Sequence, residues 1–346
     1  MFDDTTRDLP EPESPDPQIG PGETPGSAAS PALDLVSRIR TQIGRAVVGQ
    51  EDVVEQVLAA LLAGGHVLLE GVPGVGKTLL ALSLSRTFGG TFRRVQFTPD
   101  LMPSDVTGHS VYRPETGEFR IRKGPAFTHL LLADEINRAP AKTQAALLEV
   151  MQEQQVSIEG ESFQLPGPFL VIATQNPIEH EGTYPLPEAQ LDRFLLKVLI
   201  PYPSDTDTEV AIVARVTEGR SGDRLDVGSV EQVAEPESVL ELQKTASALT
   251  VDRRILDYAV RIVRTTREWG GLRLGTGPRG AIALVRTARA LALLAERDFV
   301  VPDDVKRAAL PVLRHRVSVS PELEMAGQTA DDVLSQMLED VEAPRR

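Results

Sequence analysis

An apolar run at residues 66–70 gives way to the glycine-rich segment GVPGVGKT at residues 71–78, and a second apolar run follows at once. Short apolar runs that end in glycine are typical of buried strands, whereas the residues after Thr78 have the pattern of a helix. Glycine lets the backbone curl so that successive N–H groups point inward, and the first helical turn adds a partial positive charge. The segment therefore predicts a strand, an anion-binding loop and a helix in direct succession.

The same segment matches the pattern G-x-x-x-x-G-K-[ST] in full, in the strand-to-helix context that a phosphate-binding loop (P-loop) requires. Lys77 is expected to place its charge on the terminal phosphates, and the Thr78 hydroxyl to be a ligand of Mg²⁺. We therefore predict that ATP and Mg²⁺ bind here. The loop and helix residues expected to contact the nucleotide are Gly71, Val72, Pro73, Gly74, Val75, Gly76, Lys77, Thr78 and Leu79.

Polar residues end two later apolar runs. Asp134 and Glu135 follow the first of them. A carboxylate at Asp134 can hold Mg²⁺ through water, and Glu135 can polarise a water molecule for attack on the γ-phosphate. Asn176 ends the next run, where an amide can orient that water, although a plain turn residue is the alternative interpretation. A kinase would also use the first acid, but the second acid favours hydrolysis.

Apolar runs alternate with helical patterns from residue 32 to about residue 203, which predicts a parallel sheet with helices on both faces. After this point only helical patterns remain, so we expect an α/β domain at 32–203 and a smaller all-helical domain at 204–346. Residues 1–31 are rich in proline, with seven acidic residues and one basic residue, and predict a disordered tail. The five runs expected to form strands are residues 66–71, 92–98, 129–135, 169–176 and 194–200.

Two segments of the α/β domain, at about 109–125 and 155–168, are predicted to form hairpins. The first carries Arg120, Arg122 and Lys123. These side chains can contact nucleic acid, or they can form a solvated hairpin edge that discourages strand pairing.

Composition excludes several classes of protein. The absence of cysteine excludes disulfides and thiolate catalysis. The net charge of -14 predicts repulsion of nucleic acid, so a nucleic-acid partner is not expected. Neither a signal-peptide pattern nor a membrane-length apolar run is present, so we expect a cytoplasmic protein without membrane insertion.

Four further stretches are distinctive, at residues 94–108, 137–153, 173–194 and 277–284. With these stretches, residues from about 33 to 335 closely resemble the MoxR family of AAA+ ATPases. The P-loop is shared by many families, but the stretches at 94–108 and 173–194 are specific to this one. The resemblance implies an AAA+ sheet followed by a helical lid, and a ring, commonly a hexamer, with ATP bound between neighbouring subunits. It also implies chaperone-like remodelling or activation of partner proteins, which often carry von Willebrand factor A domains.

The resemblance assigns further roles. Asn176 corresponds to the sensor 1 residue, Arg193 to the arginine finger that reaches the neighbour's γ-phosphate, and Arg279 to sensor 2 of the lid. Pro278 suits the first position of a helix, which puts Arg279 in its first turn, pointing toward the cleft between the domains. For Arg193, a local ion pair with Asp192 or Glu188 is the alternative. The residues expected near the adenine are Val48, Gly49 and Gln50.

Three other functions stay open at this point. A nucleic-acid motor is one, because related rings thread DNA through similar hairpins that face the pore, although two surface hairpins packed on their own domain fit the pattern as well. A small-molecule kinase that uses the P-loop alone is the second. A magnesium-chelatase-type subunit is the third, with the same ATP chemistry and a different substrate.

Overall fold

The computed structural model of the chain describes residues 29–176, 182–203, 205–217 and 225–344. Residues 1–28 of the acidic tail predicted at 1–31 lie outside the described ranges. Helix α1 (Ala29–Gly44) includes the last three residues of that predicted tail. None of the helices in the described ranges has the length and apolar character needed to cross a membrane.

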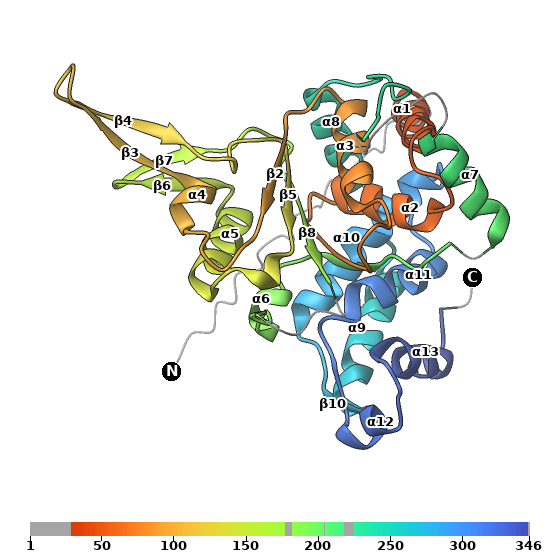
Figure 1. Cartoon of the computed structure of the whole chain (residues 1–346). Helices are drawn as coiled ribbons and strands as arrows, with labels where there is room; N and C mark the ends of the chain where they lie inside the picture. The colour runs from red at the N-terminus through yellow and green to blue at the C-terminus, as the bar shows by residue number, and fades with distance from the viewer. Residues whose placement is uncertain (1–28, 177–181, 204, 218–224, 345–346) are drawn as a thin grey trace, which may run out of the picture.

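A parallel sheet of five strands forms the centre of the first half of the chain (Figure 1). Its strands lie in the order β2-β5-β8-β1-β9, and all neighbours run in the same direction. Each strand falls within one of the five apolar runs, so the predicted α/β fold is confirmed. The strands are β1 (Val67–Glu70), β2 (Phe92–Gln96), β5 (Leu130–Asp134), β8 (Leu170–Gln175) and β9 (Leu196–Leu199).

Helices cover both faces of this sheet, and they include α2 (Glu51–Leu62), α3 (Lys77–Thr87), α4 (Pro103–Thr107) and α5 (Ala141–Glu153). Successive side chains of a strand point to opposite faces, so each strand contributes to two cores. Leu69 and Ile172 pack with α1, α2 and α3 on one face. Leu68 and Val171 pack with α4 and α5 on the other. The alternation therefore explains how the short apolar runs of the central strands serve two helical layers.

The last third of the chain is mostly helical and packs against the α/β part. Helices α8 and α10 contact α2, and α11 contacts β9, so one apolar core runs through both parts. One short sheet adds to the predicted helical lid, because β10 (Leu272–Leu274) pairs antiparallel with β11 (Ser318–Val319). Strands this short leave no periodic pattern in a sequence. The helices are α7 (Thr206–Thr217), α8 (Pro236–Ala248), α9 (Arg253–Glu268), α10 (Pro278–Leu294), α11 (Pro302–Leu313), α12 (Pro321–Met325) and α13 (Ala330–Asp340).

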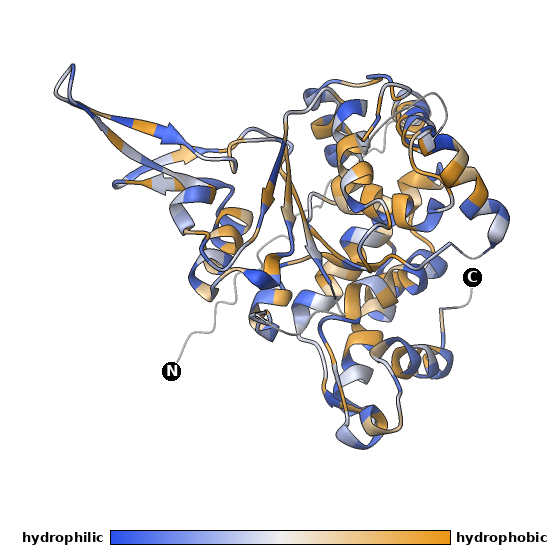
Figure 2. Cartoon of the chain, in the orientation of Figure 1, coloured by the Kyte–Doolittle hydropathy of each residue, from blue (hydrophilic) through white to orange (hydrophobic). Residues whose placement is uncertain are grey.

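Two hairpins lie on the α5 side of the sheet. They pair β3 (Gly108–Arg113) with β4 (Glu118–Lys123), and β6 (Gln155–Ile158) with β7 (Glu161–Gln164). The first projects well beyond the body of the molecule (Figure 1), and Figure 2 shows that it is mostly hydrophilic. The rings of Tyr112 and Phe119 face each other across its strands, with centroids 5.2 Å apart, and both side chains are exposed. They pack on each other and not on the core.

His66 is a buried imidazole that joins the start of β1 to its surroundings. Its Nε2 donates to the Met151 carbonyl at 3.0 Å, and its Nδ1 accepts from the Val171 N–H at 3.0 Å. Both nitrogens are therefore used by the neutral ring. Burial lowers the pKa of His66 from 6.5 to about 4, the Met151 hydrogen bond opposes this, and the Arg286 charge lowers it further.

His66 should make folding stability depend on pH. Because its folded pKa lies below its unfolded one, the stability is fully present above pH 6.5 and is lost as pH falls toward 4. Between about pH 7.5 and about pH 5.5 this amounts to roughly 1 to 1.5 kcal/mol. We expect wild type to lose that much more free energy of unfolding than His66→Gln, which keeps a donor but cannot titrate, in urea denaturation at the two pH values. Equal losses in both proteins would contradict the assignment.

Candidate active site

The P-loop backbone adopts conformations that require glycine. Gly74 and Gly76 have φ of +88° and +83°, in the left-handed region that side chains disfavour. A Cβ at Gly71 would lie 2.9 Å from the carbonyl oxygen of Ile200. The strand therefore turns into α3 through a loop that brings its backbone N–H groups to the surface, as phosphate binding needs.

Lys77 begins α3 and folds back over the loop, where its Nζ donates to the Gly71 carbonyl at 2.6 Å. Burial lowers the pKa of Lys77, while the charges of Asp134, Glu135 and Glu70 raise it. The ammonium group thus lies in the field of three carboxylates. Thr78 follows in the same helical turn and is half-buried.

The segment Val48–Gly49–Gln50 lies against the P-loop. Gln50 Nε2 donates to the Val75 carbonyl at 2.8 Å. Gly49 has a φ of +70°, and a Cβ there would collide with Thr208 of α7. The structure therefore encloses this segment between the loop and α7, which agrees with a position beside the base of a bound nucleotide.

Strand order brings the acidic pair and Asn176 to the P-loop. Strand β8 lies between β5 and β1, so the ends of all three strands meet at one edge of the sheet. Its register pairs Thr174 with Leu69 and Ala173 with Ala133, which puts Asp134 level with Thr174. Asn176 follows β8, is buried, and so lies between the acids and the loop.

Asp134 is held by two neighbours that sequence patterns did not single out. The Thr174 hydroxyl donates to Oδ1 at 2.6 Å, and it accepts the Glu135 N–H at 2.9 Å. Arg94 of β2 donates to Oδ2 from Nη2 at 2.6 Å and from Nε at 3.1 Å. These bonds satisfy a carboxylate that is only 9% exposed and fix its direction.

Glu135 has an uncommon backbone conformation, with φ of +55°. A non-glycine residue in this region carries local strain, which proteins concentrate at functional sites. Its Oε2 accepts from Gln96 Nε2 at 2.7 Å and pairs with Arg138 Nε at 3.2 Å. The carboxylate is therefore steered by Gln96, the last residue of β2. No sequence signal marked Gln96, because its contact depends on β2 lying beside β5.

Arg193 and Arg279 lie away from this site. Arg193 precedes β9, and the strands are parallel, so it lies at the amino end of the sheet. The four residues of β1 alone separate the two edges by about 13 Å. Arg279 does begin α10 behind Pro278, as predicted, but its Nη1 pairs with Asp192 Oδ2 at 3.3 Å and so points to that same far edge. Its side chain therefore lies in the cleft between the lid and the α/β part, at the edge of the sheet opposite the P-loop.

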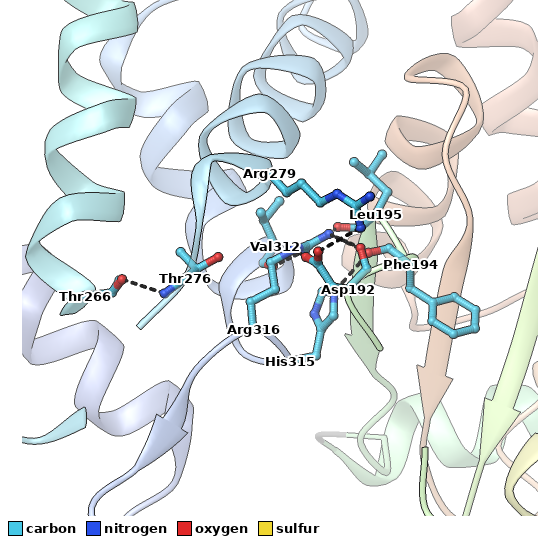
Figure 3. A network of polar contacts seen from close by, with 9 residues as sticks. All are labelled: Asp192, Phe194, Leu195, Thr266, Thr276, Arg279, Val312, His315 and Arg316. Carbon is cyan, nitrogen blue, oxygen red and sulfur yellow. Dashed lines mark hydrogen bonds and ion pairs between the residues drawn. The ribbon is translucent and has the colours of Figure 1, made fainter. Parts of the chain in front are cut away.

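The far edge contains a cavity of about 430 Å³ that is rich in arginine. Arg193 is exposed there, and its Nη1 donates to the Leu148 carbonyl at 3.0 Å. Figure 3 shows Arg279 and Arg316 converging on the segment that begins at Asp192. The charged residues that line the cavity are Asp192, Arg193, Arg279, Arg286 and Arg316.

The residues near the P-loop fit ATP with Mg²⁺. The loop offers backbone donors and an ammonium group to the phosphates, and Thr78 and Asp134 offer the hard oxygen ligands that Mg²⁺ prefers. Within the described residues no group of three or more His, Cys, Asp or Glu side chains can hold a metal alone. That donor set suits a cation whose other ligands are phosphate oxygens and water.

Comparison with known proteins agrees with this geometry. Residues 66–196 match the ATPase family associated with various cellular activities (AAA), and residues 264–337 match the AAA lid domain. The chain is 44% identical to Chaperone MoxR1 of Mycobacterium tuberculosis, over 96% of this chain and 88% of that one.

A second relative, Protein MoxR of Methylorubrum extorquens, is 33% identical, over 90% of this chain and 96% of its own length. The crystal structure of a candidate ATPase from Cytophaga hutchinsonii matches with a TM-score of 0.84 and 38% identity, over 92% of this chain and 97% of that one. The protein is an ATPase, and the chain belongs to the MoxR family of AAA+ proteins.

Proposed function

We propose that this ATPase hydrolyses ATP with Mg²⁺ at sites shared between neighbouring subunits of a closed ring, and that hydrolysis remodels or activates partner proteins. One observation carries the proposal. The P-loop and acids lie at one edge of the sheet, while Arg193 and Arg279 lie at the other. A site that needs both sets is incomplete within one subunit.

Each residue at the P-loop edge has a proposed role. Lys77 and the loop N–H groups bind the β- and γ-phosphates, and Thr78 and Asp134 hold Mg²⁺. When bound, Mg²⁺ neutralises charge on the phosphate oxygens. Glu135 accepts a proton from the attacking water, and Asn176 orients that water. Arg94 and Thr174 keep the Asp134 carboxylate in place.

The arginine-lined cavity is the proposed acceptor for the neighbour's triphosphate. It presents the exposed guanidinium groups of Arg193, Arg279 and Arg286 against the one carboxylate of Asp192, so it favours a highly charged anion. Arg193 is the proposed finger, and Arg279, beside it, is proposed to act on the same neighbouring nucleotide. A finger of this kind is worth about 10³–10⁵ in rate in other NTPases.

Joining two different edges makes the contact between subunits heterologous, and such contacts generate rings when the rotation closes. A hexamer is the ring size that family resemblance favours. We propose the domain organisation predicted from the sequence, with an ATPase domain up to residue 203 and a lid at 204–346, except that the ATPase domain begins with α1 at Ala29 and not at residue 32. A cytoplasmic location is likewise proposed.

A protein client, with a von Willebrand factor A domain, is the proposed partner. The relative named as a chaperone supports a protein substrate. A nucleic-acid motor is less well supported, because the chain carries a net charge of -14. A small-molecule kinase does not use a second acid such as Glu135 or a finger such as Arg193.

Glu135→Gln should separate binding from hydrolysis. Losing a general base lowers kcat by about 10²–10⁴-fold, while the Mg²⁺-ATP affinity stays close to that of wild type. Lys77→Ala should instead abolish the heat of Mg²⁺-ATP binding in calorimetry. Phosphate release and calorimetry on both variants check this, and equal hydrolysis rates for wild type and Glu135→Gln would remove Glu135 from its role.

Arg193→Ala should leave ATP binding intact and lower kcat by about 10³–10⁵-fold. Mixed with Glu135→Gln, it should regain activity, because some shared sites then combine an intact Glu135 with an intact Arg193. Activity per subunit should also fall on dilution of wild type. An inactive mixture, or activity that is independent of concentration, would contradict shared sites.

A client with a von Willebrand factor A domain should bind the ATP-loaded Glu135→Gln ring and dissociate when ADP replaces ATP. The measurement is co-sedimentation of purified ring with purified A-domain protein, with Lys77→Ala as the matched control that cannot load. Stimulation of hydrolysis by single-stranded DNA, and not by A-domain protein, would favour the motor instead.

A further inference from the structure

Arg316 is an almost fully buried arginine in the turn that follows α11, with a side chain only 4% exposed. Burial lowers the pKa of its guanidinium, and the Asp192 carboxylate opposes this shift. Buried arginines persist where their donors are satisfied. The groups that accept hydrogen bonds from Arg316 therefore indicate what this residue does in the fold.

The guanidinium of Arg316 holds the segment 192–195, which carries Arg193 (Figure 3). Nε donates to Asp192 Oδ1 at 2.8 Å. Nη2 donates to the carbonyls of Phe194 at 2.7 Å and Asp192 at 3.3 Å, and Nη1 to the Leu195 carbonyl at 3.1 Å. Its Nη1 also donates to the Val312 carbonyl of α11 and lies 2.8 Å from His315 Nε2. Four of these six contacts thus go to the residues on the two sides of Arg193.

Asp192 connects Arg316 to Arg279. While Oδ1 accepts from Arg316, Oδ2 pairs with Arg279 at 3.3 Å. His315 adds a further lid contact, because its Nε2 donates to the Phe194 carbonyl at 3.0 Å. One carboxylate therefore links a buried guanidinium of the lid to an exposed one.

We propose that Arg316 is a positioning residue that, through the 192–195 segment and the Asp192 carboxylate, aims Arg193 and Arg279 as one unit at the neighbouring subunit's nucleotide. This rests on the proposed shared site. Arg316 contacts no nucleotide itself. Its planar fork reaches carbonyls on both sides of Arg193, which a lysine ammonium cannot do.

Arg316→Lys tests the proposal, with Arg314→Lys as the matched control. Arg314 is similarly buried, and its donors go to Asp331 and the Lys197 carbonyl, with none to segment 192–195. We expect Arg316→Lys to unfold cooperatively and to keep its ATP affinity, with kcat lower on the order of 100-fold, because misplaced catalytic groups cost about this much. Arg314→Lys should keep kcat within a few-fold of wild type.

A complementation assay distinguishes positioning from a merely structural role. Arg316→Lys and Glu135→Gln are co-expressed with two affinity tags so that only mixed assemblies are recovered. About a quarter of the shared sites then combine an intact Glu135 with a correctly held Arg193, so activity should recover to that order. A structural defect in the Arg316→Lys subunit would reduce its own P-loop site, and the mixture would stay inactive.

The pair Arg193→Ala with Glu135→Gln is the reference. If the reference pair does not recover ATP hydrolysis, the proposal of a shared site is itself wrong. If it recovers and the Arg316→Lys pair does not, or if Arg316→Lys alone has wild-type kcat, Arg316 has no positioning role. Should Arg316→Lys fail to fold, Asp192→Asn, which keeps the acceptor for Arg316 and removes the charge shared with Arg279, takes its place with the same expected complementation.

Discussion

The common direction of the five strands is the constraint on which the rest of this molecule depends. Because β1, β5 and β8 end at one edge, the P-loop, Asp134 and Asn176 meet there, as ligand-binding residues do in open parallel sheets. The same direction puts the residues that precede β9, including Arg193, at the opposite edge. One property of the backbone thus gathers the P-loop, the acids and Asn176, and keeps Arg193 apart from them.

Local patterns were enough to predict much of this. The P-loop is a contiguous segment whose chemistry is readable from glycine spacing and Lys77. The strands are short apolar runs, and the alternation of runs and helices indicates a parallel sheet. Asp134 and Glu135 could be placed near the loop because the acids end one strand of that sheet and the loop follows another.

What could not be predicted depends on strand order and on packing between distant segments. Gln96 meets Glu135, and Arg94 meets Asp134, only because β2 lies beside β5, and chain order does not specify that neighbour. The direction of Arg279 depends in the same way on where the lid packs, since Asp192 is 87 residues away along the chain. The family resemblance identified Arg279, and Pro278 placed it in the first turn of a helix, but neither indicated that Asp192 would be its partner.

The shared carboxylate of Asp192 has a consequence for how a closed assembly would behave. Its two oxygens serve two guanidinium groups at once. If phosphate drew Arg279 away in the proposed shared site, Arg316 would lose the repulsion of that neighbouring positive charge and would keep Asp192 to itself. Nucleotide on one subunit of the proposed ring would then change the contacts of segment 192–195 in the next subunit, always in the same direction around the ring.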